Sequence, residues 1–115
     1  MATMVEIREY RDRDGRSPFG EWRSGLDSPA RQRVTTVVLR IGLGNFSNVK
    51  GVGGGVFEFR INFGPGYRVY FGKDGEEIVI LLGGGTKRRQ ENDIQIALRR
   101  WEDYKQRKQH PKAEE

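Results

Sequence analysis

The feature that most limits the fold is a regular alternation of apolar and polar residues over 56–63 and again over 67–71. A period of two is typical of strands that have one buried face and one polar face. Gly64-Pro65-Gly66 separates the two runs and predicts a turn, so we expect an antiparallel hairpin. A third run, residues 78–82, is apolar throughout, which predicts a central strand buried on both faces and ended by Gly83–Gly85.

Helix signals come before the hairpin. Ser17-Pro18 and Ser28-Pro29 each place a capping residue before a proline, which is typical of a helix start. Residues 34–39 are rich in β-branched side chains and would suit a strand by propensity. The apolar positions nevertheless recur at helical spacing, so the sequence favours a helix there. Those positions are Ala30, Val34, Val37, Val38 and Ile41.

The other segments complete an α+β domain. A weak strand is predicted over 5–11, the glycine-rich segment 42–55 is expected to be a loop, and a helix is predicted over 90–106. The predicted order is strand, two helices, three strands, helix, with two N-terminal helices and one C-terminal helix packed on a mostly antiparallel sheet. We expect one domain over residues 1–104, and a frayed helix end with a disordered basic tail over 105–115.

The composition excludes several kinds of protein and site. The 115 residues carry 21 basic and 16 acidic side chains, so the net charge is +5, and there is no cysteine and one histidine. Disulfide scaffolds, thiolate zinc sites and sites that need two histidines are therefore excluded. No acidic cluster has metal-ligand spacing and neither glycine-rich segment has the spacing of a nucleotide-binding loop, so we expect no metal and no cofactor. The lack of a long apolar run or a signal-peptide pattern predicts a cytoplasmic protein without a membrane span.

The polar face of the hairpin is the candidate functional site. Because the opposite face is committed to the core, we expect this face to be exposed or covered by a mobile element. Guanidinium groups bind phosphate oxygens bidentately, so one interpretation is a phosphate-binding site in which a tyrosine donates and a glutamate accepts a proton. The other is a solvated face on which Glu58 pairs with an arginine. The face carries Glu58, Arg60, Asn62, Arg68 and Tyr70, and the cations Lys87, Arg88 and Arg89 follow the third strand nearby.

Four segments of the chain resemble one family. They are Val56–Ile61 (VFEFRI), Gly64–Phe71 (GPGYRVYF), Leu82–Lys87 (LGGGTK) and Gln90–Ile94 (QENDI). Together they resemble the RelE/ParE superfamily of toxins from bacterial type II toxin–antitoxin modules, and more narrowly its HigB-like addiction module killer proteins. The resemblance covers residues 5–106, and the family fold agrees with the order of elements that the patterns predict.

The resemblance implies a cytotoxin that is neutralised by a cognate antitoxin, expected to be a helix-turn-helix protein from the same operon. RelE-type members are ribosome-dependent, metal-independent endoribonucleases that cleave mRNA and so inhibit translation, with the 2′-hydroxyl of the RNA as nucleophile. The implied partners are therefore the antitoxin, the ribosome and mRNA, with operator DNA reached only through the antitoxin complex. The implied catalytic residues are Arg68, Arg60, Glu58, Tyr70 and Lys87, and the implied nucleic-acid-binding residues are Lys87, Arg88 and Arg89.

Some positions depart from the family pattern. RelE has a lysine where this chain has Glu58, and the well-studied HigB toxins use histidines, whereas the single histidine here is His110, in the expected tail. We expect Tyr104 to be structural rather than the counterpart of the C-terminal tyrosine near the RelE active site. Without a histidine, Glu58 is the candidate general base. Two alternatives stay open: a ParE-like DNA gyrase poison, which shares the fold, and a catalytically inactive homologue that only binds its antitoxin.

Overall fold

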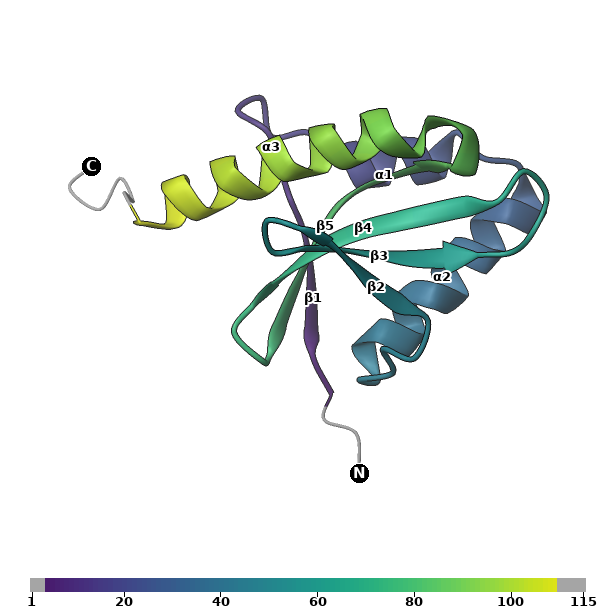
Figure 1. Ribbon diagram of the computed structural model, residues 1–115, viewed down its shortest axis with the longest axis horizontal. Coiled ribbons are helices and arrows are strands. Elements are labelled where there is room, and N and C mark those ends of the chain that lie inside the picture. Colours follow the sequence, from purple (N-terminus) through teal and green to yellow (C-terminus); the bar gives the residue numbers. More distant parts are fainter. Residues whose placement is uncertain (1–3, 110–115) are drawn as a thin grey trace.

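The computed structural model describes residues 4–109, which form a five-stranded sheet with three α-helices (Figure 1). The strands lie in the order β1-β5-β4-β3-β2, with β1 parallel to β5 and the other pairings antiparallel. This arrangement confirms the predicted α+β class. The elements are β1 (Glu6–Glu9), α1 (Pro18–Ser24), α2 (Ser28–Gly42), β2 (Val49–Gly53), β3 (Val56–Ile61), β4 (Tyr67–Asp74), β5 (Ile78–Thr86), the 3₁₀ turn η1 (Lys87–Arg89) and α3 (Gln90–Gln109). Among the described residues, no helix is both long and apolar enough to cross a bilayer.

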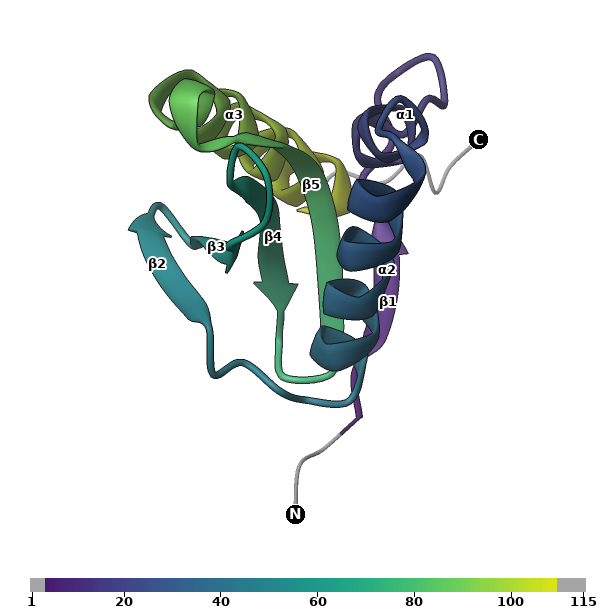
Figure 2. The same cartoon turned by 90° about the vertical axis from the view of Figure 1, so that its right-hand side faces the viewer.

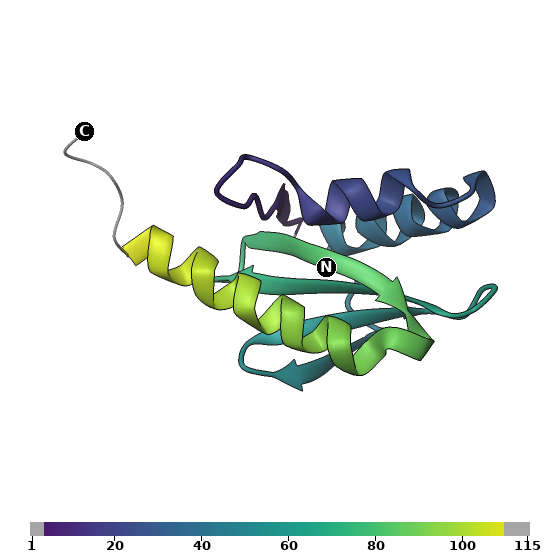
Figure 3. The ribbon, with the colours of Figure 1, turned by 90° about the horizontal axis from the view of Figure 1, so that it is seen from above.

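The sheet lies between helices on both of its faces (Figures 2 and 3). Helices α1 and α2 lie against one face and α3 crosses the other, so the central strands β4 and β5 are buried on both sides. Removal of this apolar surface from water is the main force that holds the three layers together. The α1/α2 side of the core contains Phe19, Val34, Val37, Ile41, Phe59, Val69, Phe71 and Leu81. The α3 side contains Tyr10, Val56, Tyr70, Ile80, Leu82, Ala97 and Trp101.

Helix α1 begins where the sequence predicts it. Helix α2 begins one residue earlier than the sequence predicts, because its cap is Asp27 and not Ser28. Ser17 caps α1, and its Oγ accepts a hydrogen bond from the Gly20 N–H at 2.9 Å. In α2 the cap is Asp27, whose Oδ1 accepts from the Ala30 N–H at 3.0 Å. A carboxylate is as good a cap as a serine hydroxyl and its charge also suits the helix dipole. Residues 34–39 are helical, as predicted, because the apolar stripe of α2 is buried against the sheet.

The segment expected to be a glycine-rich loop contains a fifth strand. β2 pairs antiparallel with β3, with Val49 opposite Phe59 and Gly51 opposite Phe57. Glycines and a lysine have little strand propensity, so local reasoning missed this element. Backbone hydrogen bonds to the free edge of β3 form the strand here, and that edge exists only in the assembled sheet.

The three glycines that were expected to end the third strand lie within it, and β5 continues to Thr86. Their role is to let side chains from both faces of the sheet lie close to the backbone of β5. A Cβ added at Gly84 would overlap the Trp22 ring of α1, and one added at Gly85 would overlap the Asp93 carboxylate of α3. Glycine therefore lets two helices approach the end of a central strand closely.

The C-terminal helix is longer than predicted. α3 continues to Gln109, so residues 105–109 are helical rather than frayed, and residues 110–115, including His110, lie outside the described part of the chain. Tyr104 has contacts that fit its expected structural role: its hydroxyl donates to Asp74 Oδ2 at 2.6 Å and its ring stacks on Trp101. Ion pairs also hold this end of the helix. They are Lys105 with Glu102, Arg107 with Asp103, and Lys108 with Asp74.

We expect Gly72→Ala in β4 to lower the free energy of unfolding by about 1–3 kcal/mol, the usual cost of overpacking a core. The reason is that an added Cβ would overlap the indole of Trp101, which is 5 % exposed and held between α3 and the sheet. Gly51→Ala in β2 is the matched control, because its Cβ would lie 3.8 Å from Phe57, an ordinary contact distance. Urea denaturation of both variants measures the difference. Equal losses would show that the close approach of Trp101 is not what Gly72 provides.

Candidate functional site

Four of the five predicted polar residues of the hairpin lie side by side on the face of the sheet that α3 covers, whereas Asn62 follows the end of β3 and is not part of this group. The β3–β4 register places Glu58 directly opposite Tyr70 and Arg60 directly opposite Arg68. Residues in such positions have Cβ atoms about 4.5–5.5 Å apart. On β5, glycines occupy the next positions along both rows, so no side chain there separates the group from α3. The register therefore brings together an acid, two guanidiniums and a phenol.

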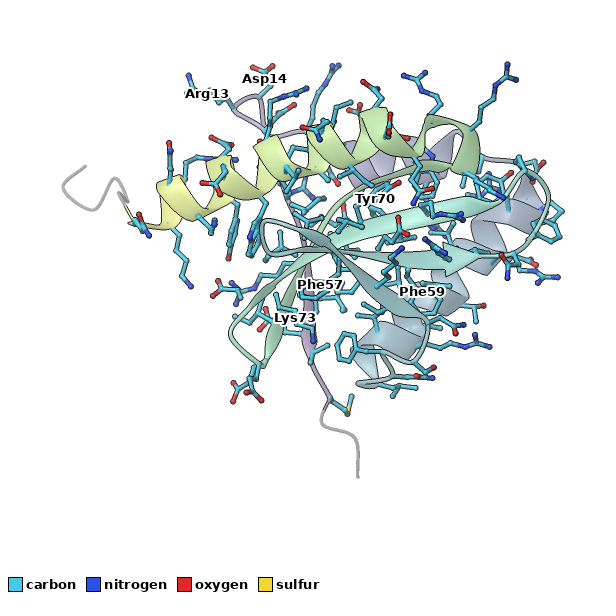
Figure 4. All side chains as sticks on the ribbon, in the orientation of Figure 1. Arg13, Asp14, Phe57, Phe59, Tyr70 and Lys73 are labelled. Carbon is cyan, nitrogen blue, oxygen red and sulfur yellow. The ribbon has the colours of Figure 1, made fainter. Side chains whose placement is uncertain are left out.

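The sequence left two expectations for this face, exposure or cover by a mobile element, and exposure is wrong for three of the four residues, which α3 covers. Glu58 is 0 % exposed, Tyr70 1 % and Arg68 5 %. Figure 4 shows Tyr70 between the sheet and α3. The cause is the apolar stripe of α3, which needs a partner surface and packs on the apolar residues that surround these side chains. Arg60 stays at the rim, with 43 % of its side chain exposed.

Glu58 is the centre of a hydrogen-bonded network. Its Oε2 accepts from Arg60 Nε at 2.7 Å, and both of its oxygens accept from Gln90 Nε2, at 2.9 and 3.1 Å. Three hydrogen bonds from two donor groups thus satisfy a carboxylate that water does not reach, as a buried charge requires. One of the two interpretations of the sequence was a solvated face on which Glu58 pairs with an arginine. The pairing with Arg60 matches this geometry, but Glu58 is buried and not solvated.

Two polar atoms at the centre of the site have no partner among the described residues. Arg68 donates through Nη1 to the Tyr67 carbonyl at 3.1 Å, whereas its Nε and the hydroxyl of Tyr70 form no hydrogen bond. Buried polar groups are nearly always paired, so these two atoms are places where water or a ligand is expected to bind. Burial raises the pKa of Tyr70, and the nearby carboxylates of Glu58 and Asp93 raise it further. The phenol therefore stays protonated near neutral pH and keeps a proton that it can donate.

A small cavity of about 110 Å³ adjoins Tyr70 between α1, β5 and α3. Asp93 and Arg100 of α3 line it together with two of the β5 glycines. Burial raises the pKa of Asp93, and Arg100 donates to the Leu82 carbonyl at 2.9 Å. At roughly 30 Å³ of liquid volume per molecule, the cavity has room for a few waters, which would satisfy Tyr70.

Sequence reasoning missed the contribution of α3 to this site. Gln90, Asp93 and Arg100 all face the sheet, and none was among the predicted site residues. A signal was present in the sequence, because Asp93 and Arg100 share a helical face with the apolar positions Ala97 and Ile94. Polar residues within an otherwise apolar stripe often mark a polar group on the surface that the helix covers.

The cations that follow β5 lie beside the buried group. Lys87, Arg88 and Arg89 form η1 and are exposed. The Lys87 N–H donates to the Gly66 carbonyl at 2.7 Å, and a Cβ added at Gly66 would lie 3.3 Å from Lys87 Cβ and 3.8 Å from Arg68 Nη1. The hairpin turn therefore fixes the backbone and Cβ of Lys87 beside Gly66, on the side where the Arg68 guanidinium lies.

The arrangement suits the binding of an anion at the rim rather than of a metal. Arg60 and Lys87 are accessible, and Arg68 lies just inside them. In the part of the chain that the structure describes, no three histidine, aspartate or glutamate side chains gather in a way that could hold a metal ion. Guanidiniums and an ammonium on one rim bind phosphate or carboxylate oxygens.

We expect Glu58→Gln to lower the free energy of unfolding by about 1–3 kcal/mol, because the change removes the buried negative charge that accepts the hydrogen bond from Arg60. Glu6→Gln is the matched control: Glu6 pairs with Arg8 at 2.6 Å, but both side chains are more than half exposed. Exposed pairs contribute at most about 1 kcal/mol. Chemical denaturation of the two variants measures both effects. A Glu58→Gln variant as stable as the control would show that the charge of the carboxylate does not stabilise the buried network.

Comparison with known proteins assigns the chain to a family. No protein-family model matches the chain. An uncharacterized protein of Haemophilus influenzae (strain ATCC 51907 / DSM 11121 / KW20 / Rd) is 41% identical over 80 residues, which are 69% of this chain and 81% of that protein. Identity at this level over most of both chains reflects common descent and a shared fold. The chain therefore belongs to the same family as this Haemophilus influenzae protein.

Proposed function

We propose that the protein is the toxin of a type II toxin–antitoxin module, a HigB-like member of the RelE/ParE superfamily that acts in the cytoplasm as a ribosome-dependent, metal-independent mRNA endoribonuclease. One observation carries the proposal. Arg60 and Arg68 are directly opposite one another on neighbouring strands, with Lys87 beside them. Like charges in this position repel each other, so the pair needs negative charge nearby. Glu58 supplies part of it, and a bound phosphate would supply more.

In the proposed reaction, the 2′-oxygen of a nucleotide attacks the adjacent phosphorus. The bond from phosphorus to the 5′-oxygen breaks, which leaves a 2′,3′-cyclic phosphate and a 5′-hydroxyl. Arg68, Arg60 and Lys87 would stabilise the negative charge that develops on the phosphate, usually the largest contribution to such catalysis. Glu58 would accept the 2′ proton. Tyr70, which burial keeps protonated, would donate a proton to the leaving oxygen.

The closed arrangement explains why such a site would depend on the ribosome. Gln90 at the start of α3 occupies both oxygens of Glu58, and α3 covers Arg68 and Tyr70. Access to the site requires that η1 and the first turn of α3 move away from the sheet. Binding of ribosomal RNA or mRNA to the exposed cations Lys87, Arg88 and Arg89 would favour that movement. An antitoxin with acidic residues would bind the same cations and hold the site closed, and operator DNA would be reached only through that complex.

Burial of Glu58, Arg68 and Tyr70 also favours a second candidate, a protein that acts by binding alone. Such a protein would be a ParE-like DNA gyrase poison or an inactive homologue that only binds its antitoxin. Pulse labelling of protein and DNA after induced expression distinguishes the endoribonuclease, the gyrase poison and the inactive homologue. Protein synthesis stops first for the endoribonuclease and DNA synthesis stops first for the gyrase poison, whereas neither stops for the inactive homologue.

We expect expression without antitoxin to stop translation and growth, and Arg68→Ala to abolish the arrest because the reacting phosphate loses its innermost guanidinium. Arg68 is buried, so Arg60→Ala, at the rim, is the companion variant. It should reduce toxicity, and it should also lower stability because Glu58 keeps only Gln90 as a partner. Arg99→Ala, at an exposed position of α3, is the matched control and should stay toxic. Radiolabelled amino-acid incorporation reports activity and circular dichroism reports folding. Folded Arg68→Ala and Arg60→Ala variants with full toxicity would place the chemistry elsewhere.

RNA cleavage is expected to persist in EDTA, because the proposed 2′-hydroxyl attack uses guanidinium and ammonium groups in place of a metal. The measurement is the appearance of 2′,3′-cyclic phosphate ends on ribosome-bound mRNA after chelation. Sedimentation must show that the ribosomes are still intact, because ribosomes themselves require Mg²⁺. Cleavage that stops while the ribosomes remain intact, and that returns with added Mg²⁺, would contradict the proposed chemistry.

A further inference from the structure

We propose that a cationic groove between α2 and β3, on the opposite side of the sheet from α3, binds the phosphate backbone of single-stranded RNA. The identity of the ligand as RNA rests on the proposed function. The groove has a volume of about 420 Å³. Its walls are Arg33, Thr36, Arg40, Asn48, Arg60 and Asn62, and its floor is Val37, Phe59 and Ile61. We call it the α2–β3 groove.

The groove exists because β3 extends beyond the residues that pair with β2. The β2–β3 register begins with Val49 opposite Phe59, so in the described part of the chain Arg60 and Ile61 extend past the end of β2. Helix α2 closes the other side of this gap, and Phe59 in Figure 4 points toward that helix. Arg33 and Arg40 are seven residues apart in α2, which places both on the helix face that borders the groove.

The groove has an excess of positive charge. The described residues that line it include three arginines and no carboxylate. Arg33 and Arg40 form no ion pair with any residue in the range 4–109, and Arg60 bonds Glu58 only through Nε, which leaves its terminal nitrogens available. The Arg33 guanidinium lies 4.4 Å from the centre of the Phe63 ring, a contact that restrains it. The guanidiniums of Arg33 and Arg40, which no carboxylate of the described residues neutralises, attract a polyanion to this concave surface.

The surface that the groove presents favours a nucleic acid backbone over an acidic protein segment. A peptide would need apolar pockets for its anchoring side chains, but the floor residues Val37, Phe59 and Ile61 are only 4, 2 and 7 % exposed. The accessible wall is formed by guanidinium, amide and hydroxyl groups, which hydrogen-bond phosphates and sugars. A single-stranded RNA in an extended conformation fits across the edge of a β-strand of this kind.

Arg60 connects the groove with the candidate site. It lines the groove on the α2 side, and its Nε is bonded to Glu58 on the α3 side. An RNA strand held by Arg33 and Arg40 would therefore pass Arg60 and place a neighbouring phosphate near Arg68, directly opposite. The groove would orient the substrate without itself taking part in the chemistry.

The test is the salt dependence of binding of a short fluorescent oligouridylate, measured by anisotropy. The double variant Arg33→Gln/Arg40→Gln is expected to lose two phosphate contacts, so the slope of log affinity against log salt should shrink by about 1.4. Binding near 0.1 M salt should weaken roughly 10- to 30-fold. Arg13→Gln/Arg99→Gln removes the same charge from exposed positions outside the groove and should change binding little.

A second variant separates charge from shape. Arg33→Lys/Arg40→Lys keeps the charge and loses the planar fork, so the salt slope should be retained while affinity falls several-fold. Thermal unfolding of each variant checks folding, which should be little affected because both arginines are exposed. Equal losses in the groove variant and the control variant, or no loss in the groove variant, would overturn the proposal. Stronger competition by an oligoglutamate peptide than by unlabelled oligouridylate would assign the groove to a protein partner and would overturn it too.

The outcomes also distinguish this inference from the proposed function. If oligouridylate binding depends on Arg33 and Arg40 but expression leaves translation unaffected, the groove stands and the endoribonuclease proposal fails. If expression stops translation while oligouridylate binding does not depend on these arginines, the groove fails and the endoribonuclease proposal stands.

Discussion

Close contact between indole rings and backbone glycines determines how the layers of this protein fit together. Trp101 of α3 lies on Gly72 of β4 and Trp22 of α1 lies on Gly84 of β5, from opposite faces of the sheet. Because glycine has no side chain, each helix can approach the central strands closely at these points. The position of α3 follows from this contact, and with it the burial of every side chain beneath the helix.

The polar residues of the candidate site are therefore part of a core and not of an open surface. A carboxylate at 0 % exposure is tolerated because Arg60 and Gln90 satisfy both of its oxygens. Within residues 4–109, Arg68 Nε and the Tyr70 hydroxyl have no hydrogen-bond partner, so these two atoms retain hydrogen-bonding capacity that the fold itself does not use. Buried polar atoms without partners lower the stability of the fold, and residues that lower stability in this way are frequent at functional sites.

Positive charge continues from the site to both of its edges. Lys87 lies next to Arg68 at the hairpin turn, and Arg60 extends from the network around Glu58 into the α2–β3 groove. The cations thus form a connected surface around the end of β3 and β4 although they come from three distant parts of the chain. A polyanion could contact both faces of the sheet at this edge, which a single isolated arginine would not allow.

The sequence by itself determined the elements whose signals are local. Alternation of apolar and polar residues defined β3 and β4, and Ser17-Pro18 with the apolar spacing defined α1 and α2. The short turn between β3 and β4 then fixed their register. The grouping of Glu58, Arg60, Arg68 and Tyr70 was therefore predictable. Only the tertiary structure decided that β2 forms on the edge of β3, that the glycines of β5 lie inside a strand, and that α3 covers the polar face with Gln90 on Glu58. These features depend on contacts between segments far apart in the chain, and residue patterns within one segment carry no information about which surface another segment will cover.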